Sequence, residues 1–409
     1  MISKFRIKNF RSIVDLTLDF SYGEGKAPNG YREMYSHPFL ETPAPSKERL
    51  VPCMAIFGAN ASGKTNIVAA LTMLRHLMSH SIDEAKYVQN MLHSELKTTL
   101  LEATFFTNEH KYLYKIEFAE GEILEETLDC DEECLYSIMN RAGMFFNITP
   151  SDYPTERIHS IFNAECVKDE KQKATFLSRI EQYFPSLNSQ VSAAAAWCKG
   201  LHIVPLDRAL ALPDVVKDIL KKLSPEDRAF ILPELTKALK KLDVDIDGLS
   251  VEKSPWENTE LLFSHYTRDD GETVTLDFRD ESQGTNALLI LLTFLLPVLK
   301  SVGGVFIIDE IDASLHPVLL REIVQMFKSR RHNTGNTQMI FTTHTTDILE
   351  DSILRPSEIT LVRKTRKWGT LAKRLVEMKN EDGLDIRNVT NFRKQYLDGF
   401  YSGIPHPAI

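Results

Sequence analysis

Cysteine is scarce in this chain of 409 residues, and its placement argues against two kinds of site. The five cysteines stand at positions 53, 130, 134, 166 and 198, and no two of them have CxxC spacing. This pattern supports neither a disulfide framework nor a zinc cluster. Cys130 and Cys134 flank the acidic run Asp131-Glu132-Glu133, which we interpret as a solvated turn rather than a metal site.

Long apolar runs are also missing. The longest, Ala287–Leu299, is interrupted by Thr293 and Pro297 and is shorter than the ~20 residues that cross a bilayer. We therefore expect a buried helix there. The amino terminus lacks the charged-then-apolar pattern of a signal peptide. Together these features predict a cytoplasmic protein with no membrane partner.

The chain has no excess of basic residues. Its formal net charge is −9, which disfavours a protein that covers nucleic acid with its whole surface. One local basic stretch, Arg363–Trp368, combines cations with an aromatic ring. It is either a solvated hairpin turn or a contact for phosphates and a stacked base.

Residues 58–65 read GANASGKT and follow the apolar run 51–57. This is a complete phosphate-binding loop in the strand-loop-helix context that the motif requires, which makes a chance match a poor explanation. Glycines let backbone amides turn toward phosphates, Lys64 reaches the terminal phosphates, and the Thr65 hydroxyl ligates Mg²⁺. The sequence predicts a nucleoside triphosphate, ATP, and Mg²⁺ as cofactors. The predicted nucleotide-binding residues here are Asn60, Ala61, Ser62, Gly63, Lys64, Thr65 and Asn66.

A second apolar run, 305–308, ends in Asp309-Glu310. A parallel nucleotide-binding sheet places a carboxylate pair at this point, although an acidic pair can also simply end a strand. We predict that Asp309 holds Mg²⁺ together with Thr65, and that Glu310 polarises the water that attacks the γ-phosphate.

Three further motifs occur in a fixed order around this pair. Residues 281–285 read ESQGT, 312–317 read DASLHP, and 339–344 read MIFTTH. With the two motifs above, this order resembles the ATP-binding-cassette (ABC) ATPases. The resemblance implies that Ser282 and Gly284 form the signature motif, that Asp312 belongs to the D-loop, and that His344 is the switch histidine. A lone histidine at a strand end is otherwise more often a core residue.

Glu281 stands where transporters of this family commonly have leucine. This departure favours soluble relatives of the RecF and SMC type over a transporter ATPase. A serine and a glycine at a helix N-terminus also form an anion site. Because the sheet already has its own phosphate loop, the second site is best used on the ATP of another subunit. We therefore expect a homo-oligomer, a dimer or higher, that sandwiches nucleotide between subunits.

The amino terminus alternates apolar and polar residues over Ile2–Phe10 and Val14–Phe20, which predicts two antiparallel strands. The stretch Lys8–Ser12 resembles the opening of RecF-like and OLD-like ATPases, where such a hairpin belongs to a β-subdomain. Arg11 either contacts the nucleotide or is a solvated turn residue. Paired strands are also expected at 112–118 and 123–128.

These elements define the expected fold: an α/β, ABC-type P-loop ATPase head with an N-terminal antiparallel β-subdomain and an inserted helical arm. We expect an N-terminal ATPase lobe at 1–150, the helical arm at 151–250 and a C-terminal ATPase lobe at 251–409. Prolines, including Pro205 and Pro233, interrupt the arm, which excludes a long coiled coil.

The segment after His344 is too short to hold the Toprim nuclease domain of OLD-family proteins. Its end resembles stand-alone bacterial ATPases of the AbiL and RloA kind and the ATPase subunit of the PARIS system, which are linked with anti-phage defence and a Toprim-type partner. The leading hypothesis is an ATPase sensor or scaffold of an anti-phage, abortive-infection system that controls a separate nuclease effector, with DNA or a phage protein as the trigger. The alternative is a RecF/SMC-like DNA-repair ATPase that clamps DNA.

Overall fold

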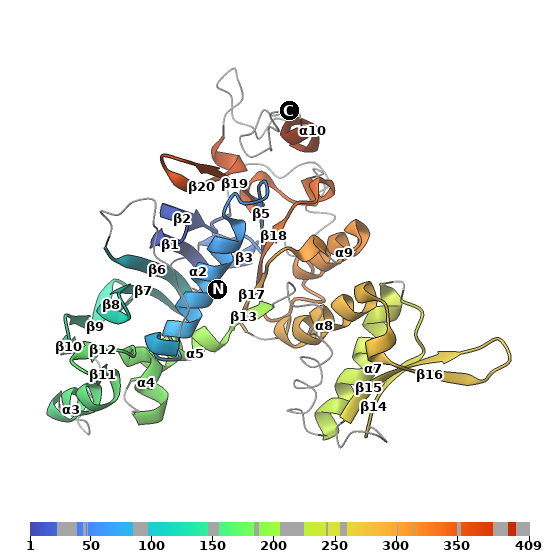
Figure 1. Ribbon diagram of the computed structural model, residues 1–409, viewed down its shortest axis with the longest axis horizontal. Coiled ribbons are helices and arrows are strands. Elements are labelled where there is room, and N and C mark those ends of the chain that lie inside the picture. The colour runs from blue at the N-terminus through green and yellow to red at the C-terminus, as the bar shows by residue number, and fades with distance from the viewer. Residues whose placement is uncertain are drawn as a thin grey trace.

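A single sheet of thirteen strands runs through the molecule (Figure 1). The computed structural model describes residues 1–22, 39–43, 46, 48–84, 97–145, 155–183, 188–204, 225–242, 244–253, 260–300, 302–313, 315–349, 353–378 and 392–397. The strands of the large sheet, in chain order, are β1 (Ile2–Phe10), β2 (Ile13–Asp19), β5 (Cys53–Phe57), β6 (Thr99–Thr107), β7 (His110–Ala119), β8 (Glu122–Cys130), β9 (Glu133–Met139), β10 (Ala142–Phe145), β13 (Leu201–Val204), β17 (Val305–Ile308), β18 (Gln338–Thr343), β19 (Ile359–Thr365) and β20 (Gly369–Arg374).

The sheet has an antiparallel half and a parallel half. Its spatial order is β10-β9-β8-β7-β6-β1-β2-β20-β19-β5-β18-β17-β13. Every neighbouring pair from β10 to β19 is antiparallel, and β19, β5, β18, β17 and β13 are mutually parallel. The parallel half therefore carries the strand ends at which nucleotide-binding motifs converge.

The antiparallel half confirms the predicted hairpins. β1 pairs with β2, with Phe5 opposite Leu18, and β7 pairs with β8, with Tyr114 opposite Leu128. The alternating pattern is explained by one buried face, since Phe5 and Ile7 are both fully buried. The sheet continues beyond the expected end through β9 and β10, and Asp131 and Glu132 form the turn between β8 and β9.

Helices cover both faces of the parallel half. The helices of the described residues are α2 (Lys64–Leu77), α3 (Thr155–Cys166), α4 (Phe176–Tyr183), α5 (Ser189–Lys199), α7 (Pro225–Lys241), α8 (Gln283–Val298), α9 (Pro317–Phe327) and α10 (Phe392–Leu397). Alternate residues of β5 enter two different cores. Met54 and Ile56 join the core with α2 and α5, whereas Ala55 and Phe57 join the core with α8 and α9. The apolar run of β5 is thus explained by burial on both faces.

The predicted helical arm at 151–250 needs one correction. Residues 201–204 form β13, which pairs in parallel with β17 at the edge of the central sheet. This stretch therefore belongs to the large sheet and not to a separate helical arm. Four residues, of which three are apolar, are too few for sequence periodicity to distinguish a strand from a helix. Pro233 also lies inside α7 without ending it, while Pro205 lies outside the described residues.

A smaller, three-stranded antiparallel sheet precedes α8. It consists of β14 (Gly248–Lys253), β15 (Glu260–Thr267) and β16 (Thr273–Asp277). Figure 1 shows this sheet beside α7, with the β15–β16 hairpin projecting away from the rest of the molecule. Two short pairs complete the strands of the described residues: β3 (Leu40–Glu41) with β4 (Arg49–Leu50), and β11 (Val167–Lys168) with β12 (Lys171–Gln172).

The apolar run 287–299 forms most of α8, as expected. Leu289, Leu291 and Leu292 are fully buried in the core between this helix and the large sheet. Across the described residues, none of the helices combines the length and the apolar character that a membrane span requires.

Candidate functional site

The loop predicted to bind phosphate connects β5 to α2. α2 begins at Lys64 after Gly63, whose φ of 109° is left-handed, and no side chain caps the helix. Uncapped amides at a helix start attract anions. A Cβ on Gly63 would lie 2.1 Å from Thr370 Oγ1, and a Cβ on Gly58 would lie 2.4 Å from the Val362 carbonyl oxygen. Both glycines are therefore required by close contact with the hairpin β19–β20.

A hydrogen-bond network fixes this loop from the side of the amino-terminal hairpin. Thr370 Oγ1 donates to the Ser62 carbonyl at 3.1 Å and lies 2.7 Å from Ser12 Oγ. Asn66 Nδ2 donates to Ser12 Oγ at 2.6 Å, and Arg11 donates to Asn66 Oδ1 at 3.4 Å. The turn residue Arg11 thus contacts the first turn of α2 and is not simply solvated.

Lys64 is buried at the centre of the loop. Its Nζ donates to the Gly58 carbonyl at 2.8 Å and to the Ala59 carbonyl at 3.2 Å, and it lies 3.5 Å from His344 Nδ1. Burial lowers the pKa of Lys64, while Glu310 and nearby carboxylates act in the opposite direction. The structure therefore brings the phosphate-loop lysine together with the acidic pair and the predicted switch histidine.

Asp309 and Glu310 follow β17 and are both held by one buried threonine of the neighbouring strand. Thr342 Oγ1 on β18 donates to Asp309 Oδ1 at 2.5 Å and accepts from the Glu310 amide at 2.7 Å. Glu310 has a φ of 50°, a left-handed conformation that is strained for a residue other than glycine. Its side chain is exposed, so it points away from the core.

Asp312 lies against the end of β18. Its Oδ2 accepts from the His344 amide at 2.9 Å and from Thr345 Oγ1 at 3.0 Å. Its Oδ1 is buried and has no hydrogen-bond partner among the described residues. The His344 side chain is exposed, which rules out the alternative that it is a core histidine.

The predicted signature residues begin α8. Ser282 is the N-cap, with Oγ accepting from the Thr285 amide at 3.1 Å, and both Ser282 and Gly284 are exposed. In the described part of the chain no hydrogen bond joins them to the phosphate loop. Glu281 faces the smaller sheet instead: its Oε1 accepts from Ser264 Oγ at 2.5 Å and from Tyr266 at 2.6 Å.

One known protein family matches most of this chain. A family model described as an AAA domain, putative AbiEii toxin, type IV TA system, matches residues 53–350. The chain belongs to this family. No curated protein matches the sequence.

Two solved structures similar to this AAA-family chain are SMC heads. The SMC head domain from Thermotoga maritima is 13% identical, covers 91% of this chain and 98% of its own, and has a TM-score of 0.43. An SMC head bound to the C-terminal winged-helix domain of ScpA is 14% identical with the same coverage and a TM-score of 0.44. The arrangement described above, a large mixed sheet with helices on both faces and a phosphate loop after β5, is an α/β fold with a P-loop.

The residues of this AAA domain fit ATP and Mg²⁺. Ser62 Oγ is buried in the phosphate loop without a hydrogen-bond partner in the described part of the chain. Thr65, Asn60 and Ala61 are exposed on the same loop and helix start, and Ala61 adopts a left-handed φ of 61°. The Thr65 hydroxyl and the Asp309 carboxylate are hard oxygen donors of the kind that Mg²⁺ prefers.

Sequence reasoning missed the residues that support this site. Thr342 holds the acidic pair, and Ser12 and Thr370 hold the phosphate loop. A signal for Thr342 exists, because two polar residues, Thr342 and Thr343, interrupt an apolar strand just before His344. Ser12 and Thr370 offer no such signal, because their roles arise from strand pairing far apart in the sequence.

Proposed function

We propose that this chain is a cytoplasmic ATPase that joins two copies of itself through bound ATP and separates them by hydrolysis. The observation that carries the proposal is the convergence of Lys64, Asp309, Glu310 and His344 at the carboxyl ends of the adjacent strands β5, β17 and β18. A cation, two carboxylates and an imidazole at one sheet edge are the groups that phosphoryl transfer to water requires.

Each side chain has a distinct chemical task in this proposal. Lys64 and the loop amides bind the β- and γ-phosphates, and Thr65 and Asp309 hold Mg²⁺, which neutralises charge on the phosphates. Glu310 accepts a proton from the attacking water, and its left-handed backbone directs the carboxylate out of the core. His344 lies next to Lys64 Nζ and contacts the γ-phosphate. Thr342 holds the Asp309 carboxylate and the Glu310 backbone amide in position.

The exposure of the signature supports an intermolecular site. Ser282 and Gly284 begin α8 at the surface, where their helix start can meet the ATP of a second copy. Asp312 fixes the backbone of His344. Two copies related by a twofold axis would then bury two nucleotides.

The test is the native mass of the Glu310→Gln variant with and without ATP. We expect this variant to bind ATP, to lose turnover and to accumulate as a dimer or higher oligomer, since water activation is lost while binding is kept. Glu322→Gln, an exposed site on α9, is the matched control and should behave as wild type. Retained turnover in Glu310→Gln would contradict the role of Glu310 as the base. A native mass that does not change with ATP would contradict the joining of two copies through bound nucleotide.

We further propose that the ATPase acts as the sensor or scaffold of an anti-phage system and restrains a separate effector of the Toprim nuclease type. The description of the family as a putative toxin of a type IV toxin–antitoxin system supports a role in defence more than one in transport. The proposal predicts that the Glu310→Gln oligomer, purified from its host, carries a nuclease encoded nearby. A particle that holds only this chain under all nucleotide conditions would count against an effector.

A second candidate function, DNA clamping of the RecF/SMC type, is favoured by one basic groove. Lys237, Lys240 and Lys241 line a groove between α7 and β14, in which Lys240 pairs with Asp247 at 3.0 Å and the other two lysines leave an excess of positive charge. Burial, followed by the charges of Lys241 and Arg331, lowers the pKa of His332, so cations from α7 and from the segment after α9 lie close together. Such a cluster suits a phosphate backbone.

The basic groove gives this second function its own test. ATP-dependent retention of duplex DNA by Glu310→Gln, lost when Lys237→Ala and Lys241→Ala are added, would favour the clamp. Lys4→Ala combined with Lys8→Ala, on the less buried side of β1, serves as the charge-matched control. Absence of DNA retention at low salt would contradict the DNA-clamp function.

A further inference from the structure

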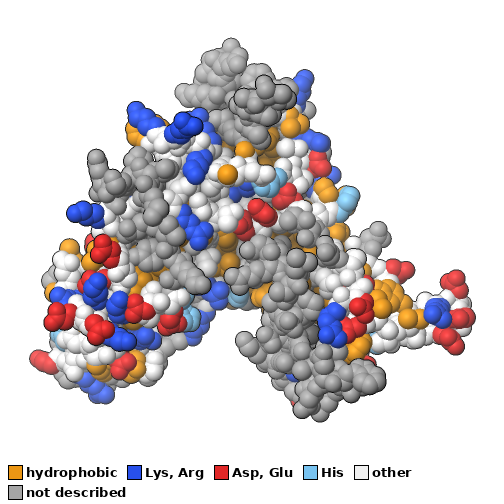
Figure 2. All heavy atoms as spheres, in the orientation of Figure 1, with side chains coloured by type: hydrophobic (Ala, Val, Ile, Leu, Met, Phe, Trp, Pro, Cys, Tyr) orange, Lys and Arg blue, Asp and Glu red, His pale blue; other side chains and the backbone are white. Residues whose placement is uncertain are grey.

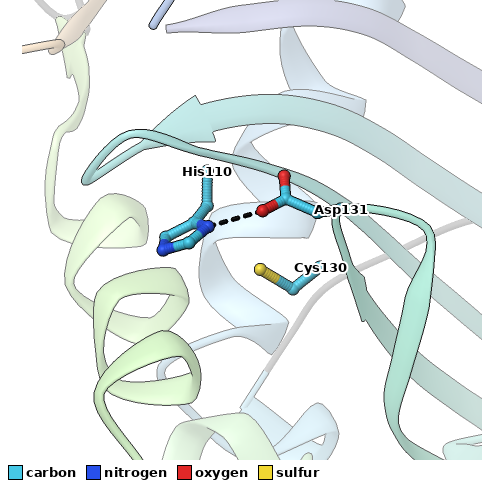
Figure 3. A group of neighbouring side chains, drawn as sticks. All are labelled: His110, Cys130 and Asp131. Carbon is cyan, nitrogen blue, oxygen red and sulfur yellow. Dashed lines mark hydrogen bonds and ion pairs between the residues drawn. The ribbon is translucent and has the colours of Figure 1, made fainter. Parts of the chain in front are cut away.

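His110, Cys130 and Asp131 meet at one edge of the antiparallel half of the sheet. His110 begins β7, Cys130 ends β8, and Asp131 follows in the turn to β9. One nitrogen, the sulfur and one carboxylate oxygen of these residues all lie within 4.8 Å of one another. Figure 3 shows the imidazole facing the carboxylate, with the thiol beside them. Five strands separate β7 from β5, so this cluster is independent of the ATP site.

Strand pairing holds the three residues in place. Tyr112 of β7 pairs with Cys130 of β8. The Asp131 amide donates to the Lys111 carbonyl at 2.8 Å, and the Lys111 amide donates to Asp131 Oδ1 at 2.9 Å. The other oxygen, Oδ2, lies 2.6 Å from His110 Nδ1. The backbone positions of all three candidate ligands are therefore fixed by the sheet before any ion binds.

A buried hydroxyl beside the thiol points to a ligand. Tyr112 is fully buried, and its hydroxyl has no hydrogen-bond partner among the described residues. The Cys130 thiol lies near this hydroxyl, although the two groups do not reach hydrogen-bond geometry. A thiol is a weak acceptor and a thiolate is a strong one. A metal-bound thiolate would give Tyr112 the acceptor that it lacks.

We propose that His110, Cys130 and Asp131 bind one divalent cation of the zinc class. Nitrogen, sulfur and oxygen donors together select Zn²⁺ over Mg²⁺. As the metal–sulfur bond forms, Cys130 releases its thiol proton to solvent. The imidazole of His110 changes to the tautomer that carries its proton on Nε2, so that Nδ1 is free to bind the ion and the His110–Asp131 hydrogen bond is replaced by two metal–ligand bonds. Zn–N and Zn–O bonds of about 2.0–2.1 Å require those two atoms to separate by less than about 1 Å.

The site has an open side. The side chains of His110 and Asp131 are 38% and 44% exposed, whereas Cys130 is 2% exposed. Three protein ligands and one position for water match the usual composition of an open zinc site. The ion would join the turn before β7 to the turn after β8 and stabilise this end of the sheet. The sequence pattern suggested only a solvated acidic turn, because His110 lies far from the two cysteines in the chain.

The experiment is a Co²⁺ titration of the full chain without nucleotide, followed by absorption spectroscopy. A Co²⁺–thiolate bond gives an intense near-ultraviolet charge-transfer band, which the all-oxygen Mg²⁺ site at Thr65 and Asp309 does not give. We expect one Co²⁺ per chain with this band, displaced by Zn²⁺. Cys130→Ser should abolish the band, and Cys134→Ser, a partly exposed cysteine four residues on, should keep it.

Two milder variants guard against misfolding of Cys130→Ser. Asp131→Asn keeps the acceptor for the Lys111 amide, and Tyr112→Phe removes only the unpartnered hydroxyl. We expect both to fold and to bind Co²⁺ at least about tenfold more weakly. A wild-type protein without the thiolate band, a band that survives in folded Cys130→Ser, or unchanged affinity in Asp131→Asn would each overturn the proposal.

Discussion

Thr342→Val tests whether Thr342 acts through its hydrogen bonds to Asp309 and Glu310 or only by filling space in the core. Valine has nearly the shape of threonine, so the fully buried position stays filled. The change removes the donor to Asp309 Oδ1 and the acceptor for the Glu310 amide, which lie at 2.5 and 2.7 Å from Thr342 Oγ1. Both acidic residues then lose their link to β18.

The magnitude follows from these two bonds. A hydrogen bond to an ionised carboxylate contributes about 1.5–3 kcal/mol, and a neutral one about 0.5–1.5 kcal/mol. Asp309 and Glu310 are partly accessible, so water replaces some of what is lost. We expect the free energy of unfolding to fall by about 2–3 kcal/mol. ATP turnover should fall at least about tenfold, because losing about 1.4 kcal/mol of transition-state stabilisation lowers the rate by that factor.

The assay compares urea denaturation, ATP affinity and ATP turnover with those of Thr360→Val. Thr360 is also a buried strand threonine, but the one hydrogen bond of its hydroxyl within the described residues goes to the Met54 sulfur at 3.1 Å. We expect Thr360→Val to lose about 1 kcal/mol or less and to keep turnover. If the two variants match in stability and in turnover, the assignment of Thr342 as the support of the acidic pair is wrong.

Three other sites give further tests. Lys64→Ala should abolish ATP binding in a fluorescence titration while Lys373→Ala keeps it, and unchanged affinity in Lys64→Ala would contradict the site. Gly63→Ala sets a methyl group 2.1 Å from Thr370 Oγ1 at a φ of 109°, so we expect a loss of at least about 2 kcal/mol in unfolding free energy, and wild-type denaturation would refute this. Burial raises the pKa of Glu126 above 4.5, against hydrogen bonds that lower it. The Glu126 carboxyl therefore binds a proton more tightly in the folded protein than in the unfolded chain. The stability that this proton binding contributes is complete below pH 4.5 and is lost as the pH rises through the folded pKa. Glu126→Gln should make the free energy of unfolding less dependent on pH in this range, and an unchanged pH dependence would contradict this prediction.

Local patterns explain what the sequence could predict. The phosphate loop is recognisable because GANASGKT lies between an apolar strand and a helix, and both elements are present as β5 and α2. The amino-terminal hairpin is recognisable because one face of β1 is buried and the other is not. Each of these signals is contained in fewer than about twenty consecutive residues and needs no contact with a distant part of the chain.

Long-range pairing explains what could not be predicted. β13 is a strand only because it pairs with β17, which is distant in the chain, and its four residues carry no period. The role of Thr342 depends on the adjacency of β17 and β18. The meeting of His110 with Cys130 depends likewise on the register of β7 and β8. The β13–β17 pairing and the His110–Cys130 contact leave no trace in residue spacing, and the signal for Thr342 is limited to the two threonines that interrupt the apolar run before His344.

The contact of Glu281 with the smaller sheet has a mechanical consequence. Its carboxylate is joined to Ser264 and Tyr266 of β15, and the next residue is Ser282, which starts α8. Figure 2 shows acidic side chains at the far end of the projecting hairpin that β15 forms with β16. A displacement of that hairpin would therefore be transmitted through Glu281 to Ser282, the neighbouring residue that we predict to contact the nucleotide of a second copy.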